Sequence, residues 1–210
     1  MIGVGLLEAS ASLGLLLGRL PVAAVVLAGI AGGYPGADAA SGATEPGDVA
    51  VSEPPVAVGE LVRVGEQIEV GELVRVHEEV LGDCGAWDGV RFLQASELGM
   101  AQPLGAERVG ECLRETVWWG RCEKLRRGRG CTVMGCTGSA GQARERRSST
   151  GAVVESMEGA ALLRMAAVWG VEAVQIRAVS NVAGPRDRAA WKVAEALEAL
   201  REFFADGPEA

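Results

Sequence analysis

The longest apolar stretch of the chain runs from Leu20 to Gly33 and contains no charged residue. It includes the β-branched and aliphatic run at 22–27, a composition typical of a strand buried on both faces. Its 14 residues are too few for a membrane-spanning helix, which needs roughly 20. We therefore expect a buried core strand here, opening into a glycine loop at 29–33.

Helical and strand patterns alternate around this stretch. Small and apolar residues predict a helix at 6–17, and a last helix is expected at 187–204. The face of that last helix is expected to carry Trp191, Ala194, Leu197 and Leu200. Other expected strands are at 48–52, 131–134 and 173–180, and other helical segments are at 104–119 and 158–168, with a polar, basic helix or loop at 142–148. Such alternation predicts a single α/β domain over residues 1–210, with a twisted, mostly parallel central sheet flanked by helices.

Residues 59–79 hold an internal repeat. The sequence Gly-Glu-Leu-Val-Arg-Val at 59–64 recurs unchanged at 71–76, with the near copy Gly-Glu-Gln-Ile-Glu-Val between them. Three units are too few to bury a core as a β-helix, so we expect a small β-meander. No role is assigned to this insertion.

The distribution of charge argues against nucleic acid as a partner. The net charge is −8, and residues 121–147 carry eight cations against two acids, which leaves the rest of the chain strongly acidic. A secretory signal needs a basic start, whereas Glu8 is the first charged residue here. We therefore expect a cytoplasmic protein with no membrane segment.

The cysteines and the histidine predict no metal and no disulfide framework. The five cysteines are odd in number and contain no C-x-x-C pair, so reduced thiols are expected. His77, the only histidine, stands beside acidic residues and is expected at the surface. Because Gly3 and Gly5 lack the third glycine of a dinucleotide fingerprint, a nicotinamide cofactor is not indicated.

Three segments lie where strands are expected to end. They are the glycine loop at 29–33, the segment Glu-Ser-Met-Glu-Gly-Ala-Ala at 155–161, and the segment at 177–187. In open α/β sheets, ligands bind outside the carboxyl ends of strands. Taken singly, the second segment also fits a helix N-terminus that favours acids, and the third an ordinary Asn-containing turn. Together the three segments outline one site.

In this order and spacing the segments resemble the nucleoside phosphorylase and nucleosidase superfamily, and in detail the futalosine hydrolase family. The resemblance is carried by residues 29–36, 155–161 and 177–191, with weaker matches at 83–85, 98–99 and 132–138. It implies a nucleoside phosphorylase-like fold and a homodimer. Relatives begin with a further strand and a loop that carries a water-activating glutamate. This chain departs from the family here: its first residues match a later part of the relatives, so we expect a fold lacking the usual N-terminal strand, and we do not transfer the water-activating role to Glu8.

The resemblance also implies roles for individual residues. Met157 packs on the ribose, and the Glu158 carboxylate accepts hydrogen bonds from its 2′ and 3′ hydroxyls, for which two carboxylate oxygens are well suited. Asn181 is the expected catalytic residue, since it holds the departing purine. The remaining expected substrate-binding residues are Ser156, Ser180, Ile30, Ala31 and Gly32.

Asn181 also selects among the substrates of the superfamily. Adenine-specific relatives carry an aspartate at this position, whereas an amide, which donates one hydrogen bond and accepts another, suits a 6-oxopurine. The resulting expectation is hydrolysis of the N-glycosidic bond of futalosine, which releases hypoxanthine and dehypoxanthine futalosine in menaquinone biosynthesis. Two alternatives stay open: a methylthioadenosine/S-adenosylhomocysteine nucleosidase, and a non-catalytic nucleoside-binding protein.

Overall fold

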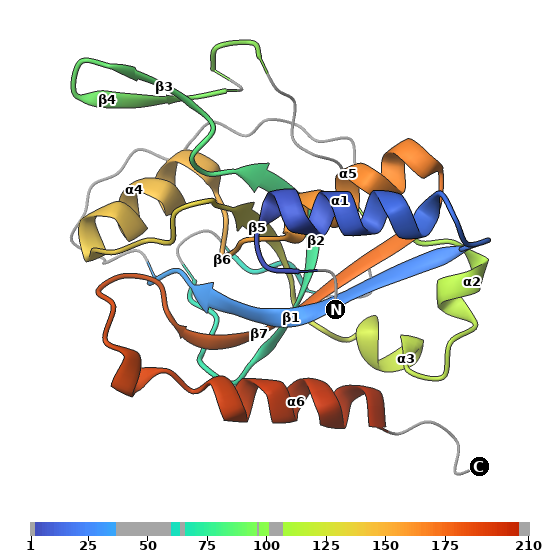
Figure 1. Ribbon diagram of the computed structural model, residues 1–210. Helices are drawn as coiled ribbons and strands as arrows, with labels where there is room; N and C mark the ends of the chain where they lie inside the picture. Colours follow the sequence, from blue (N-terminus) through green and yellow to red (C-terminus); the bar gives the residue numbers. More distant parts are fainter. Residues whose placement is uncertain (1–2, 37–59, 64–65, 96, 101–106, 206–210) are drawn as a thin grey trace.

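The computed structural model describes residues 3–36, 60–63, 66–95, 97–100 and 107–205, and the strand expected at 48–52 lies outside them. Figure 1 shows a twisted sheet between two layers of helices, which confirms the predicted α/β class. In the described residues the sheet consists of β1 (Ala24–Gly33), β2 (Leu73–Leu81), β5 (Arg127–Thr132), β6 (Val154–Ser156) and β7 (Glu172–Val182). A separate hairpin of β3 (Gly85–Asp88) and β4 (Arg91–Gln94) projects from the molecule.

Pairing within the sheet is mostly parallel, as predicted. β1 and β7 run parallel along the whole of β1, and the pairs β2–β5 and β5–β6 are parallel as well. β2 runs antiparallel to β7, and the end of β1 runs antiparallel to the start of β6. The twist of the sheet thus brings the carboxyl end of β1 beside both β7 and β6.

The expected glycine loop at 29–33 is wrong, because β1 continues as a strand to Gly33. Close packing explains the glycines. A Cβ on Gly33 would lie 3.0 Å from Val179 Cγ1, and a Cβ on Gly29 would lie 2.6 Å from Arg177 Nη1. Glycine therefore lets side chains of β7 lie against the β1 backbone, rather than forming a turn.

α1 (Leu6–Leu17) and α5 (Gly159–Trp169) cover one face of the sheet, with α4 (Ala140–Thr150) on the same side (Figure 1). The bounds of α1 match the predicted helix. Leu13 of α1 and Leu162 of α5 belong to one buried cluster with Leu27 of β1. None of the helices in the described ranges has both the length and the apolar character needed to cross a bilayer.

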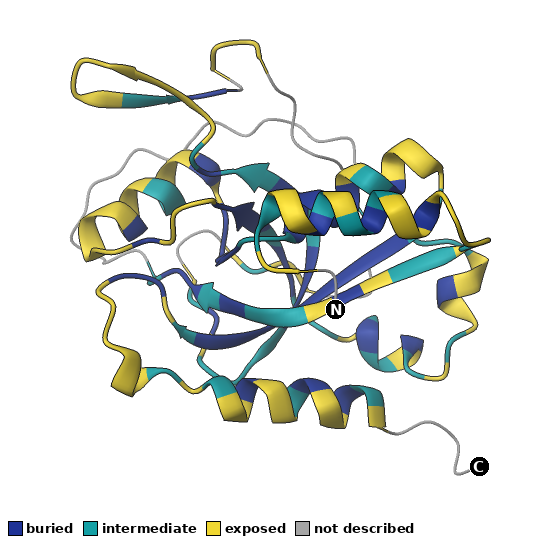
Figure 2. Cartoon of the chain, in the orientation of Figure 1, coloured by how far each residue is buried: buried dark blue, intermediate teal, exposed yellow. Residues whose placement is uncertain are grey.

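α6 (Val193–Ala205) lies on the opposite face with the short helices α2 (Glu111–Arg114) and α3 (Trp119–Cys122). In the described part of the helix expected at 104–119, only the single turn of α2 and the first residue of α3 are helical. The predicted face of α6 is wrong for Ala194 and Leu197, which are exposed, whereas Ala196, Leu200 and Phe203 are buried (Figure 2). A three-residue step drifts around a helix of 3.6 residues per turn, so it leaves the buried stripe.

The expected β-meander at 59–79 is also wrong. Leu73–Val76 of the third repeat unit pairs with β7, and Leu61 of the first unit forms a bridge with Arg127 of β5. The repeats therefore contribute to the central sheet. His77 follows the third unit within β2 and is half-buried rather than exposed, and burial lowers its pKa to about 4.

Arginines of the basic segment 121–147 face carboxylates from other parts of the chain. Glu107 lies 2.6 Å from Arg75 Nε and 3.2 Å from Arg127 Nη2. Arg129 Nη2 lies 2.9 Å from Glu78. These pairs make part of the segment a component of the folded domain.

Glu79 is a buried carboxylate that joins the sheet to α5. Its Oε1 accepts a hydrogen bond from Gln175 Nε2 of β7 at 2.7 Å, and its Oε2 accepts one from Thr132 Oγ1 of β5 at 2.9 Å. Thr132 Oγ1 in turn accepts the backbone N–H of Ala160 at 2.8 Å, in the first turn of α5. One acid thus links β2, β5, β7 and α5.

Two glycines leave the space that this carboxylate occupies. A Cβ on Gly130 or on Gly159 would overlap Glu79 Oε1. Burial raises the pKa of Glu79 to about 7, although Gln175, Arg177 and Thr132 oppose this shift.

We expect Glu79→Gln to remove a pH dependence from the free energy of unfolding. The pKa of Glu79 is about 7 in the fold against an ordinary 4.5, so the folded state keeps this proton to a higher pH than the unfolded state does. The free energy of unfolding therefore falls as pH rises between these two values. The full loss is on the order of 3 kcal/mol.

Thermal melts of both chains from pH 5 to 8 measure this difference. As pH rises, the Tm of Glu79→Gln should increase relative to the Tm of the parent chain. His77, with a lowered pKa, adds stability as pH rises, so only the difference between the chains isolates Glu79. Parallel Tm profiles would contradict the prediction.

Candidate active site

Three consecutive residues of β1 lie against the predicted site segment of β7. Gly32 faces Asn181 in the register of the two strands, and a Cβ on Gly32 would lie 3.4 Å from Asn181 Nδ2. The carbonyl of Ala31 lies 3.3 Å from Ser180 Oγ. The carbonyl of Ile30 accepts a hydrogen bond from Arg177, which precedes them on β7. The structure thus brings two of the three predicted segments together at one end of the sheet.

Glu158 stands immediately before α5 and meets one backbone amide and one cation. Its Oε1 accepts the N–H of Gly5 at 3.0 Å, and its Oε2 lies 3.6 Å from Arg177 Nη1. The same Nη1 donates to the Ile30 carbonyl at 3.3 Å. These contacts place the Glu158 carboxylate, whose side chain is 18% exposed, beside β1. Both of its oxygens keep lone pairs for ligand hydroxyls.

Arg177 is a candidate site residue that the sequence analysis did not single out. It is 2% exposed, and burial lowers its pKa while the nearby Glu79 and Glu158 oppose that shift. Within the described part of the chain its Nε and Nη2 have no hydrogen-bond partner. Such N–H groups beside a carboxylate can donate to a ligand. The available signal was a charged residue inside the apolar strand expected at 173–180.

The amide of Asn181 has a defined orientation. Its Nδ2 donates to the Val182 carbonyl at 3.1 Å, and its Oδ1 lies 2.8 Å from Ser180 Oγ. The Val182 carbonyl can only accept, so Nδ2 must face it, and the second N–H of Nδ2 stays available for a ligand. The Ser180 proton has two possible acceptors, Asn181 Oδ1 and the Ala31 carbonyl, of which the amide oxygen is nearer.

Ser156 is the last residue of β6, which pairs with the end of β1, and Met157 follows it before α5. Glu155 of β6 pairs with Gly32, and Ser156 follows as the last residue of the strand. Ser156 is buried, and its Oγ has no hydrogen-bond partner among the described residues. Met157 is half-buried at the junction of β6 and α5, where it stands between Ser156 and Glu158 in the chain.

The arrangement offers a carboxylate, a guanidinium and an amide along one strand. A carboxylate suits vicinal hydroxyls, and an oriented amide donor suits a polar heterocycle. In the described ranges no three side chains of His, Cys, Asp or Glu gather in a way that could hold a metal ion.

Comparisons with known sequences agree on one family. The family model described as the phosphorylase superfamily matches residues 1–206. Futalosine hydrolase of Thermus thermophilus is 31% identical over 205 residues, which cover 94% of this chain and 75% of that protein. Futalosine hydrolase of Streptomyces coelicolor is 49% identical over 73 residues, which cover 35% of this chain and only 30% of the relative.

Solved structures share the fold. A futalosine hydrolase mutant of Helicobacter pylori has a TM-score of 0.64 at 14% identity, covering 98% of this chain and 79% of that one. The 5′-methylthioadenosine/S-adenosylhomocysteine nucleosidase of Neisseria meningitidis, in complex with methylthio-immucillin-A, has a TM-score of 0.63 at 17% identity, covering 97% and 78%. The chain therefore belongs to the phosphorylase superfamily, and within it the chain is similar in sequence to futalosine hydrolases.

Proposed function

We propose that this chain hydrolyses the N-glycosidic bond of futalosine, releasing hypoxanthine and dehypoxanthine futalosine in menaquinone biosynthesis. The observation that carries the proposal is that Asn181 lies against Gly32 while Arg177 joins Glu158 to the Ile30 carbonyl, in a chain similar to futalosine hydrolases. In this proposal residues 1–210 act as one nucleosidase-type domain of a cytoplasmic homodimer, without metal or organic cofactor.

Glu158 binds the ribose in this proposal. The Gly5 amide and the Arg177 guanidinium hold its carboxylate beside β1, and its oxygens accept hydrogen bonds from the 2′ and 3′ hydroxyls. Arg177 balances the charge of the acid in surroundings that contain little water. The Met157 thioether packs on the sugar, and the free Ser156 hydroxyl supplies a further polar contact.

Asn181 assists departure of the base. Cleavage builds negative charge on the purine and positive charge on the sugar, so a donor aimed at the base stabilises the transition state. The free N–H of Asn181 Nδ2 can donate to N7 or O6 of a 6-oxopurine, which are both acceptors. Ser180 holds the amide in this orientation.

A nucleosidase acting on methylthioadenosine or S-adenosylhomocysteine is the second candidate, because solved structures with that name share the fold. The geometry of Asn181 argues against it. Adenine presents an amino donor at C6, whereas the group that Asn181 keeps free is an N–H donor of Nδ2, which matches the O6 acceptor of a 6-oxopurine instead.

The purified 210-residue chain is expected to release hypoxanthine from futalosine, faster than it releases purines from inosine or methylthioadenosine. Chromatography of the products measures all three reactions. A preference for methylthioadenosine would favour the second candidate. Thermal stabilisation by these nucleosides without product would instead indicate a nucleoside-binding protein, since binding to the folded state alone raises the Tm.

Asn181→Asp is expected to lower kcat/KM for hypoxanthine release by about tenfold or more, because a carboxylate facing the N7 and O6 acceptors repels them. Steady-state assays on futalosine measure the change. Gln67→Glu is the matched control, since it makes the same amide-to-acid change and keeps an acceptor for the Gly36 N–H. Unchanged turnover in Asn181→Asp would remove this residue from the base site.

A further inference from the structure

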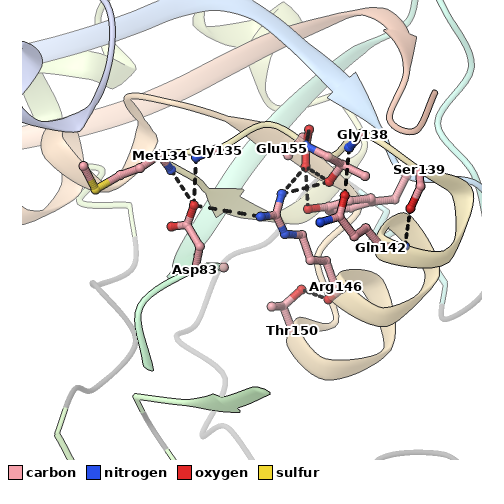
Figure 3. Close-up of polar contacts among 12 residues, drawn as sticks. Asp83, Met134, Gly135, Gly138, Ser139, Gln142, Arg146, Thr150 and Glu155 are labelled. Carbon is pink, nitrogen blue, oxygen red and sulfur yellow. Dashed lines mark hydrogen bonds and ion pairs between the residues drawn. The ribbon is translucent and has the colours of Figure 1, made fainter. Parts of the chain in front are cut away.

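A second polar network lies beside Gly32, outside the residues assigned so far. Its centre is Glu155, which is 6% exposed and pairs with Gly32 across the strands (Figure 3). The Glu155 carboxylate accepts the N–H of Thr137 at 2.9 Å, the Thr137 hydroxyl, and the Tyr34 hydroxyl at 2.9 Å. Three protein groups thus hold the Glu155 carboxylate in place.

Arg146 of α4 joins this acid to a second one. Its Nη1 donates to Thr137 Oγ1 at 2.9 Å and lies 3.4 Å from Glu155 Oε2, while its Nη2 lies 3.9 Å from Asp83 (Figure 3). Asp83 Oδ2 accepts the backbone N–H groups of Met134 at 2.7 Å and Gly135 at 2.9 Å. Two carboxylates linked by one guanidinium therefore anchor three backbone amides of the segment 133–139, which we call the β5–α4 loop.

The β5–α4 loop runs along the candidate site from one predicted segment to another. At its start the Val133 N–H donates to the Ser156 carbonyl at 2.9 Å. At its end it meets the turn that follows Asn181, because a Cβ on Gly184 would lie 3.9 Å from Ala140 N. A Cβ on Gly32 would also lie 3.5 Å from Glu155 Cγ and 3.4 Å from Asn181 Nδ2, so these two side chains flank the same glycine.

Apolar burial does not hold the middle of this loop. Met134, Gly135 and Cys136 are exposed, whereas Val133 and Thr137 on either side are buried. Hydrogen bonds to Asp83 hold the backbone of Met134 and Gly135, and one to Glu155 holds that of Thr137. Loosening the network should therefore move the loop while the hydrophobic core stays packed.

We propose that Arg146 is a positioning residue that, through Asp83 and Glu155, holds the β5–α4 loop against the Asn181 end of the site and thereby sets the affinity for the purine. This inference rests on the proposed function. The loop would contact the purine in both the ground state and the transition state, so its displacement should weaken binding of both equally. Such uniform loss raises KM and leaves kcat nearly unchanged.

The test compares Arg146→Met and Arg146→Lys with the control Arg144→Met, an exposed arginine on the same helix. Arg146→Met is expected to raise the KM for futalosine and the Kd for hypoxanthine about tenfold, with kcat within about twofold of the parent chain. Arg146→Lys should restore part of the affinity, because it keeps one cation between the two acids. Hydrogen exchange should be faster at the amides of Met134, Gly135 and Thr137 in Arg146→Met only.

Asp83→Asn keeps the test decisive if Arg146→Met does not fold. It weakens the acceptor of the Met134 and Gly135 amides at a half-buried position and should raise KM in the same direction. If the parent chain releases hypoxanthine and the variants keep its KM and Kd, the role of Arg146 is overturned while the proposed function stands. A parent chain that neither cleaves futalosine nor binds hypoxanthine would overturn the proposed function, and the inference with it.

Discussion

Burial of the Glu79 carboxylate is the constraint on which the geometry of the site depends. A carboxylate removed from water is costly unless hydrogen bonds replace its hydration, and here Gln175 and Thr132 supply them. Because Thr132 also binds the first turn of α5, the start of that helix is fixed relative to three strands. Glu158 stands one residue before the helix, so its position beside β1 follows from a contact deep in the core rather than from the loop around it.

Local patterns were enough to predict most of the elements that position the site. The small and apolar residues at 6–17 predicted α1 with its observed bounds, because glycine stands on either side of this run, at Gly5 and Gly18. β7 and α5 were predicted within a few residues of their ends, because their apolar runs are bounded by glycine and polar residues. The approach of Gly32 to Asn181 follows from the parallel pairing of β1 and β7; the alternation of strands and helices indicated a mostly parallel sheet, but not which strands pair.

The remaining features depend on contacts between distant residues. The glycines of β1 look like a loop in sequence, and only the proximity of Val179 and Arg177 shows why a strand needs them. Glu155 begins one of the predicted site segments, but nothing in the sequence indicates that Thr137, Tyr34 and Arg146 surround it, because these partners come from separate segments. Ionic partners of this kind have no periodicity that a single sequence can reveal.

The space that Gly130 and Gly159 leave for Glu79 also constrains how this sequence can change over evolutionary time. Replacing glycine by alanine usually favours a helix, yet at Gly159 the new methyl group would occupy the volume of the buried carboxylate. Such a replacement becomes tolerable only after position 79 has acquired a shorter side chain. Substitutions at these three positions should therefore be epistatic, each acceptable in one genetic background and harmful in another.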